Sequence, residues 1–109
     1  MNKSIFFDDV RTCDLTRNEF VQLAATNLNY HAIMNLRGAR LCDIDLRNLH
    51  LNNFNFNYCD LRGAKFTGAQ LSQSNWNQFE GANIEDAIFD ESHKPKLKDA
   101  INIELATFI

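Results

Sequence analysis

The chain has 109 residues, a formal net charge of −3, one proline and four glycines. This length fits one domain, and so few prolines and glycines exclude a collagen-like or disordered chain. The mild negative charge is unlike that of a nucleic-acid-binding surface, so we expect no nucleic-acid partner. Three cysteines without the spacing of a metal site or a disulfide framework favour a reducing compartment.

The first 20 residues carry acidic side chains and lack an uninterrupted apolar run, so they show no obvious secretory signal. No stretch of the sequence is apolar over the length needed to span a membrane. We therefore expect a cytoplasmic protein without a membrane partner. The alternative is secretion into a host cell without a signal peptide of the usual kind.

Residues 16–26 are compatible with two local structures. Apolar residues spaced five apart lead up to Phe20, which favours an irregular first coil. Thr16 and Glu19 have the spacing of a capping box, and Leu23 shares a helical face with Phe20, which predicts a short helix instead. The irregular coil is the preferred interpretation, and the helix is the alternative.

A large apolar residue occupies every fifth position from Leu36 to Trp76, and the positions between are mostly polar. Neither a helix, with a period near 3.6, nor a strand, with a period of 2, explains this spacing. Short extended segments joined by corners do explain it, because residues two apart in a segment point to the same side. The predicted core residues are Leu36, Leu41, Leu46, Leu51, Phe56, Leu61, Phe66, Leu71 and Trp76.

Four such sides make a coil of about 20 residues, and successive coils stack at the spacing of hydrogen-bonded strands. The stacking predicts which side chains lie above one another, inside and outside. The expected neighbours are Leu36 with Phe56 and Trp76, Leu41 with Leu61, Leu46 with Phe66, Leu51 with Leu71, a ladder of Asn35, Asn55 and Asn75, and the charge pairs Arg40 with Asp60 and Asp45 with Lys65.

These units resemble the pentapeptide-repeat proteins, whose consensus is roughly Ala-Asp/Asn-Leu-x-x. The units at 13–17, 59–63, 64–68, 69–73 and 82–86 match it well. The resemblance covers roughly residues 10 to 90 and implies an all-β fold, a right-handed quadrilateral parallel β-helix. Where the family usually has a small residue, this chain has Met34, Ile44, Leu49 and Phe54, which predicts a wider or distorted coil there.

We expect residues 1–91 to form the β-helix, with an irregular first coil or coils, and residues 92–109 to form a linker and a C-terminal α-helix. Steps of eight residues interrupt the period before Leu28, before Leu36 and between Trp76 and Ile84, and such breaks predict loops suited to recognition. The helix would either cap the open end or join two copies, so we expect a monomer or a homodimer through this helix. Its apolar stripe is Leu97, Ala100, Ile101, Leu105 and Phe108.

The chemistry-bearing residues form no catalytic pattern. His31, His50 and His93 are scattered, and the five-residue period assembles no Cys/His or Ser/His/Asp constellation. Asp45 and Asp60 also lack a second carboxylate at a catalytic distance. We therefore expect no catalytic residue, no metal ligand and no cofactor, and we expect that the protein is not an enzyme.

The sequence favours a non-catalytic protein-interaction scaffold with a protein partner of unknown identity. The resemblance adds two alternatives, a bacterial effector or adaptor protein and a DNA-mimicking protein that binds a type II topoisomerase (gyrase). A DNA mimic needs a continuous anionic face, whereas here basic residues outnumber acidic ones in the regular section. The candidate contact residues are one outward aromatic and a group of arginines, namely Tyr58, Arg37, Arg40, Arg47 and Arg62.

Overall fold

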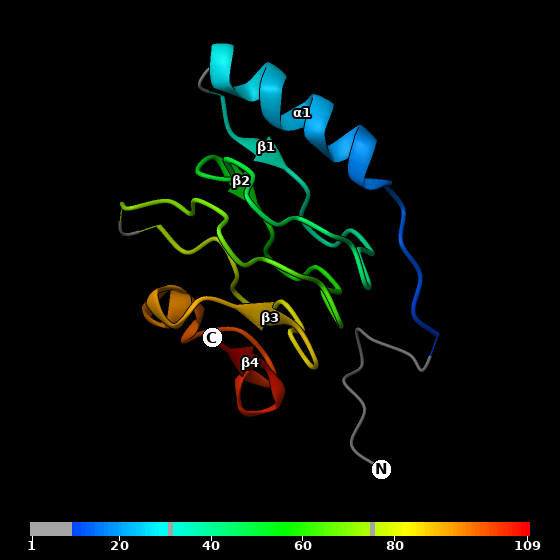
Figure 1. Cartoon of the computed structure of the whole chain (residues 1–109), viewed down its shortest axis with the longest axis vertical. Helices are drawn as coiled ribbons and strands as arrows, with labels where there is room; N and C mark the ends of the chain where they lie inside the picture. The colour runs from blue at the N-terminus through cyan, green and yellow to red at the C-terminus, as the bar shows by residue number, and fades with distance from the viewer. Residues whose placement is uncertain (1–9, 31, 75) are drawn as a thin grey trace.

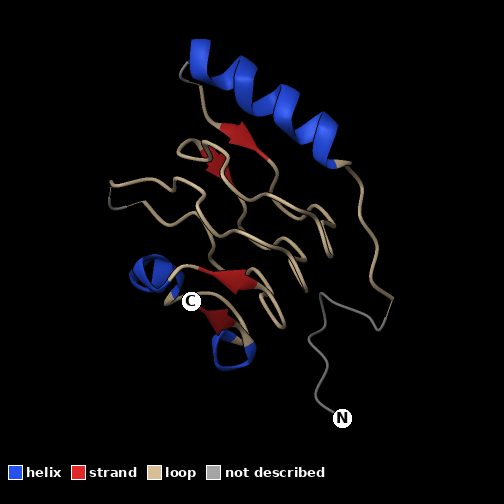
Figure 2. Ribbon diagram, in the orientation of Figure 1, coloured by secondary structure: helices blue, strands red, loops and turns tan. Residues whose placement is uncertain are grey.

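The computed structural model describes residues 10–30, 32–74 and 76–109, with only the backbone described for 27–30. Helix α1 (Arg17–Tyr30) lies across one end of the molecule, and below it the chain repeatedly returns alongside its own earlier course (Figure 1). We call each such stretch a pass. Most of each pass is turns and single bridges, and the strands among the described residues are two residues long (Figure 2).

The first pass, which contains Met34 to His50, pairs in parallel with the second, which contains Phe54 to Gln70, at four places. Strands β1 (Met34–Asn35) and β2 (Phe54–Asn55) lie side by side, and single bridges join Arg40 to Asp60, Asp45 to Lys65 and His50 to Gln70. The two passes are therefore 20 residues apart, which confirms the predicted stacking there. The anchors in this region are buried, and they are Leu41, Leu46, Leu51, Phe56, Leu61, Phe66 and Leu71, while Leu36 is half-buried.

Corners between the short segments are closed by the Asp or Asn that precedes an anchor. The side-chain oxygens of Asn35, Asp45 and Asn55 each accept a hydrogen bond from the backbone N–H two residues later, at 3.0, 3.1 and 2.8 Å. Such Asx turns account for Asp or Asn at this position. Asn35 and Asn55 lie in line as predicted, but their side-chain oxygens accept from their own backbone turns rather than from each other. Asn75 lies outside the described residues.

The third pass is displaced by 23 residues rather than 20, since Asp60 bridges to Asn83 and Lys65 to Ile88. The prediction that Trp76 continues the inner column is wrong, because three extra residues lie between Leu71 and Phe79 and not after Trp76. Phe79 is fully buried with its ring 5.2 Å from that of Phe56, whereas Trp76 is half-buried at the surface.

Helix α1 replaces the preferred irregular first coil. The capping box forms as the alternative predicted: Thr16 N–H donates to Glu19 Oε1 at 2.8 Å, and Glu19 N–H donates to Thr16 Oγ1 at 3.1 Å. Phe20 is fully buried, and its ring stacks on Phe54 at 5.0 Å and on Phe56 at 6.1 Å. The helix thus covers core that the first pass would otherwise expose.

The predicted C-terminal α-helix is wrong as well. The segment forms two 3₁₀-helices, η1 (Glu91–Leu97) and η2 (Ile103–Leu105), followed by strand β4 (Thr107–Phe108), which pairs in parallel with β3 (Ile88–Phe89). A short isolated helix is only marginally stable in water. Pairing with the preceding pass instead satisfies the backbone N–H and C=O groups of this segment.

The residues of the predicted stripe therefore have different places. Leu97 is fully buried in η1, and Ile101 bridges to Asn83. Leu105 is half-exposed in η2, and the Phe108 ring stacks on Phe89 at 6.1 Å. The α-helix predicted to cap the end or join two copies therefore does not form in residues 92–109.

Candidate functional site

Ion pairs hold two of the predicted contact arginines. Arg47 makes a two-pronged contact with Asp45, each N–O distance being 2.9 Å, and Arg40 lies 3.6 Å from Asp14. The hydrogen bond from Arg47, offset in part by burial, lowers the pKa of Asp45 well below its usual range. Asp45 thus binds Arg47 rather than the predicted partner Lys65, although the backbones of Asp45 and Lys65 pair as expected.

Arg62 is only 3 % exposed, so the prediction that it faces a partner is wrong. Its Nε donates to Asp60 Oδ1 at 2.8 Å, and its Nη2 donates to the carbonyl of Val10, in the N-terminal segment that covers this face. Burial by itself raises the pKa of Asp60, but the hydrogen bonds from Arg62 outweigh burial and lower it. The predicted side-chain pair of Asp60 with Arg40 does not form, because Arg62 occupies Asp60.

Tyr58 and Arg37 form a contact at the surface. The Arg37 guanidinium lies over the Tyr58 ring at 4.3 Å, and the Tyr58 hydroxyl donates to Glu80 Oε2 at 2.9 Å. The backbone of Tyr58 has a φ of +61°, which is uncommon for a bulky residue. Its ring lies directly against Gly81, where a Cβ would be 2.4 Å from Tyr58 Cδ1.

The extra residues before Phe79 form a loop that Gln78 anchors. Gln78 is 1 % exposed; its Nε2 donates to the carbonyls of Leu51 and Phe54 at 2.7 and 2.9 Å. Its Oε1 accepts from Ser72 N–H at 2.8 Å. The five-residue period does not predict this role, because the residue before an anchor is expected to face outward.

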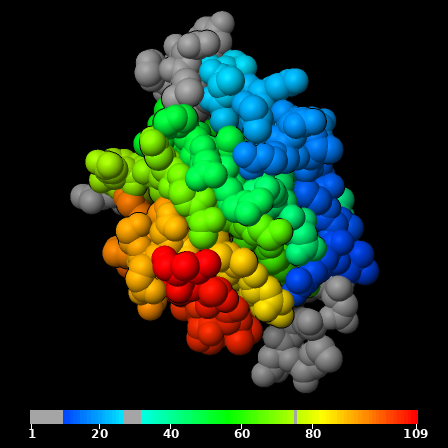
Figure 3. All heavy atoms as spheres, in the orientation of Figure 1, coloured from blue at the N-terminus to red at the C-terminus, as the bar shows by residue number. Residues whose placement is uncertain are grey.

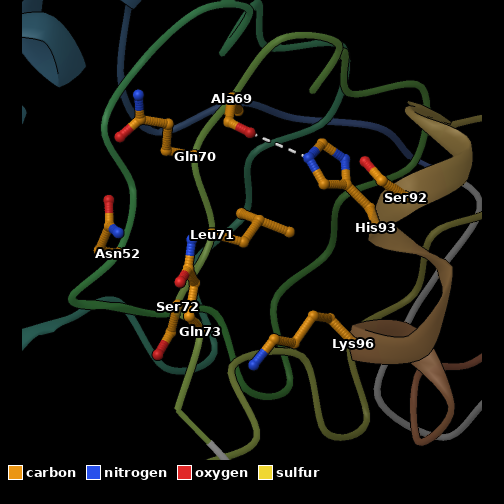
Figure 4. Close-up of a pocket in the computed structure, with 9 residues that line it drawn as sticks. All are labelled: Asn52, Ala69, Gln70, Leu71, Ser72, Gln73, Ser92, His93 and Lys96. Atoms are coloured by element: carbon orange, nitrogen blue, oxygen red, sulfur yellow. Dashed lines mark hydrogen bonds between the residues drawn. The ribbon is translucent and has the colours of Figure 1, made fainter.

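A pocket of about 330 Å³ with a mixed polar and apolar lining lies between this loop and η1. The loop protrudes beside the segment that contains η1 in the space-filling view (Figure 3). Figure 4 shows His93 and Lys96 extending from η1 toward the chain around Leu71. The residues that line the pocket are Asn52, Ala69, Gln70, Leu71, Ser72, Gln73, Ser92, His93 and Lys96.

His93 is buried, in contrast to its expected place in a linker. Its Nδ1 accepts a hydrogen bond from Asp90 N–H at 3.2 Å, and its Nε2 lies 2.9 Å from the Ala69 carbonyl oxygen. A carbonyl only accepts, so the proton is on Nε2 and the imidazole is neutral. His93 therefore joins η1 to the preceding pass.

Lys96 donates to the carbonyl of Ser74, on the loop. No carboxylate among the described residues lies within ion-pair distance of Lys96. Lys96 also lines a neighbouring pocket of about 410 Å³, whose other lining residues are Trp76, Asn77, Pro95, Lys98 and Asp99.

His93 Nε2 lies 3.6 Å from Asp90 Oδ2, but no serine hydroxyl or cysteine thiol hydrogen-bonds to a histidine ring in the described part of the chain. His50 is exposed, with Nδ1 2.7 Å from Gln70 Oε1, and His31 lies outside the described residues. No group of three or more His, Cys, Asp or Glu side chains in residues 10–30, 32–74 and 76–109 could hold a metal ion. Within the same ranges, none of the helices has the length and apolarity required to cross a membrane.

Comparison with known proteins identifies the repeat. The family model described as pentapeptide repeats matches residues 35–73 with eight copies. The match ends where the loop anchored by Gln78 begins, although bridges from Asn83 and Ile88 continue the pairing beyond it. Searches of curated proteins and of solved structures found no match. Residues 35–73 of this chain are therefore pentapeptide repeats, and such repeats imply a β-helix fold in general.

Proposed function

We propose that this protein is a non-catalytic protein-interaction scaffold, in which a right-handed, four-sided rod of pentapeptide repeats presents Tyr58 and Arg37 to a protein partner. Four pairings at a 20-residue offset support the four-sided rod. A repeat stack of this kind supplies a rigid surface, and recognition by such proteins depends on the side chains that the stack displays.

The observation that carries the proposal is that neighbouring side chains fix the position of the Tyr58 ring. A bulky residue in the left-handed region carries backbone strain, and such strain persists where the surroundings impose it, often at functional sites. Here the ring is fixed by Arg37 above it, by Glu80 at its hydroxyl and by Gly81 against its edge. Tyrosine and arginine are also the residue types that contribute most at protein interfaces.

An effector or adaptor is compatible with this proposal, because either acts by binding a protein. The DNA-mimic alternative has less support. A mimic needs a continuous row of uncompensated acidic side chains, but Asp45 and Asp60 in the middle of the rod are paired with Arg47 and Arg62. We therefore place the contact surface at Arg37 and Tyr58.

The proposal is tested by affinity capture from bacterial lysate with the wild-type chain and two variants, Tyr58→Asn and Arg37→Met. Asparagine tolerates the left-handed backbone, so the first variant removes the ring without adding strain. Arg47→Met is the matched control, since Arg47 is also exposed but is paired with Asp45.

We expect a protein that the wild type and Arg47→Met retain and that both contact variants retain at least about tenfold less, as for loss of a central interface residue. Capture of no protein beyond a tag-only bait, or equal retention by all four baits, would refute the proposed contact surface. Thermal unfolding of each variant separates lost binding from lost folding.

A further inference from the structure

The pairing between passes follows one rule, and this rule identifies a missing partner. Ile88 N–H donates to the carbonyl of Ala64 at 2.9 Å, and Phe66 N–H donates to the carbonyl of Ile88 at 2.7 Å. A residue of the next pass thus bonds to the two residues that flank its counterpart. Five residues later, the same rule calls for a partner that donates to Ala69 and accepts from Leu71.

No strand occupies that place, because the chain forms η1 there. His93 Nε2 supplies the donor, 2.9 Å from the Ala69 oxygen. The acceptor is not supplied: the backbone N–H of Leu71 makes no hydrogen bond to any residue that the structure describes. The His93 side chain therefore replaces the backbone donor of this ladder position, and the acceptor for Leu71 N–H is missing among the described residues.

The N–H of Leu71 faces the pocket. Gln70 uses both its N–H and its C=O on the preceding pass, with Leu49 and Leu51 at 2.9 and 2.8 Å. Because successive residues of a strand bond to opposite sides, the N–H of Leu71 is directed the other way, toward η1. Leu71 lines the pocket of about 330 Å³ together with Lys96, which Figure 4 shows beside it.

The positive charge of Lys96 indicates that the missing acceptor is negatively charged. An ammonium group has three donors, and a carbonyl partner, Ser74, uses one of them. Its positive charge has no carboxylate partner among the described residues. A backbone N–H and an ammonium in one pocket are matched by a group with two acceptor oxygens and a negative charge, and a carboxylate has both.

We propose that the pocket between η1 and the chain at 69–73 binds a carboxylate group, with one oxygen accepting from Leu71 N–H and the charge paired with Lys96. The proposal relies on the proposed function only in taking the carboxylate from a protein partner, as an acidic side chain or a chain terminus. The pocket is on the η1 side of the molecule and shares no lining residue with the contact of Arg37 and Tyr58.

Titration of the ¹⁵N-labelled full chain with small probes, followed by amide NMR, tests this site without a partner protein. The probes are N-acetyl-Gly-Gly with a free terminal carboxylate, N-acetyl-Asp-N-methylamide with a side-chain carboxylate, and N-acetyl-Gly-Gly-amide with neither. Lys96→Met removes the charge. Lys65→Met is the control, because Lys65 is exposed and lines neither of the two pockets.

We expect saturable, downfield movement of the Leu71 amide proton in the millimolar range with one or both carboxylates, and none with the amide. The more effective carboxylate identifies the source. Binding should weaken about tenfold or more in Lys96→Met and be unchanged in Lys65→Met.

A Leu71 signal that does not move with either carboxylate would overturn the assignment, as would equal movement with the amide or undiminished binding in Lys96→Met. Equal movement with inorganic phosphate would show a general anion site instead. None of these results depends on capture of a partner, so failure here is distinct from failure of the contact surface at Tyr58.

Discussion

A residue in the left-handed backbone region follows most anchors by two positions, with Leu51 and Leu71 as exceptions. Gly38, Gly63, Gly68 and Gly81 have φ values between 67° and 77°. Glycine adopts this conformation without a Cβ penalty, so these residues mark the corners. Tyr58 has the same backbone conformation without being glycine, and it packs into the space beside Gly81.

Two glycine variants separate backbone strain from crowding. In Gly38→Ala, the new methyl meets no atom within 4 Å, so we expect a loss of about 1 kcal/mol from the left-handed backbone alone. In Gly81→Ala, the methyl also meets the Tyr58 ring at 2.4 Å, and overpacking should add about 1–3 kcal/mol. Urea unfolding measures both losses. Equal losses, or no reduction of the difference in a Tyr58→Asn background, would contradict the placement of Tyr58.

At the scale of elements, α1 shows how local and long-range signals compete. The capping box of Thr16 and Glu19 predicts the helix from sequence, but the five-residue spacing of apolar residues leading up to Phe20 favours an irregular coil, which is the preferred interpretation. The structure is decided by packing, since Phe20 on a helix reaches both Phe54 and Phe56. Spacing within one segment does not contain that information.

Phe20→Ala tests whether α1 caps the core. Removal of a fully buried ring from a stack should lower the free energy of unfolding by about 3–5 kcal/mol. Val21→Ala, one residue along the same helix and 38 % exposed, should change it by about 0.5 kcal/mol or less. Chemical denaturation gives both values. Similar small effects of the two variants would mean that α1 does not cover the core.

The displaced third pass was predictable from one residue. Gly81 follows Phe79 by two positions, as Gly63 follows Leu61 and Gly68 follows Phe66, and this spacing places the anchor at Phe79 rather than Trp76. The C-terminal segment was not predictable in the same way. Its apolar spacing fits a helix, and its pairing with the third pass depends on backbone hydrogen bonds that no side-chain pattern records.

Across the whole molecule, most arginines in the described residues are paired within the rod. Arg62 and Asp60 are buried under the N-terminal segment, and Arg11 in that segment lies 2.8 Å from Asp86. Breaking a buried pair leaves one uncompensated charge, which is strongly destabilising. The sequence predicts the stacking of backbones, but it does not predict which carboxylate each arginine selects, because Asp60 has both Arg40 and Arg62 within reach.

The pH dependence of stability tests this buried pair. In the wild type, Arg62 lowers the pKa of Asp60, so the pair stabilises the fold above about pH 4 and this contribution is lost as the pH falls through the folded pKa. In Arg62→Met, burial becomes the largest influence on Asp60, opposed by the hydrogen bonds from Cys42 and from the backbone N–H of residue 62, and burial raises the pKa of Asp60, so the sign reverses. Relative to the wild type, we expect Arg62→Met to be less stable by about 3–5 kcal/mol at pH 7 and to recover part of that loss toward pH 4. Urea unfolding between pH 3 and pH 7, in steps of about one unit, measures it. A constant difference across this range would contradict the pairing.

The account depends most on how successive passes align, and inter-strand nuclear Overhauser effects at Lys65 measure that alignment directly. We predict contacts from Lys65 to Asp45 on one side and to Ile88 on the other, which correspond to offsets of 20 and 23 residues. Contacts from Lys65 to Glu85 in place of Ile88 would mean that Trp76 and not Phe79 continues the core, and would contradict both the loop anchored by Gln78 and the pocket beside Leu71.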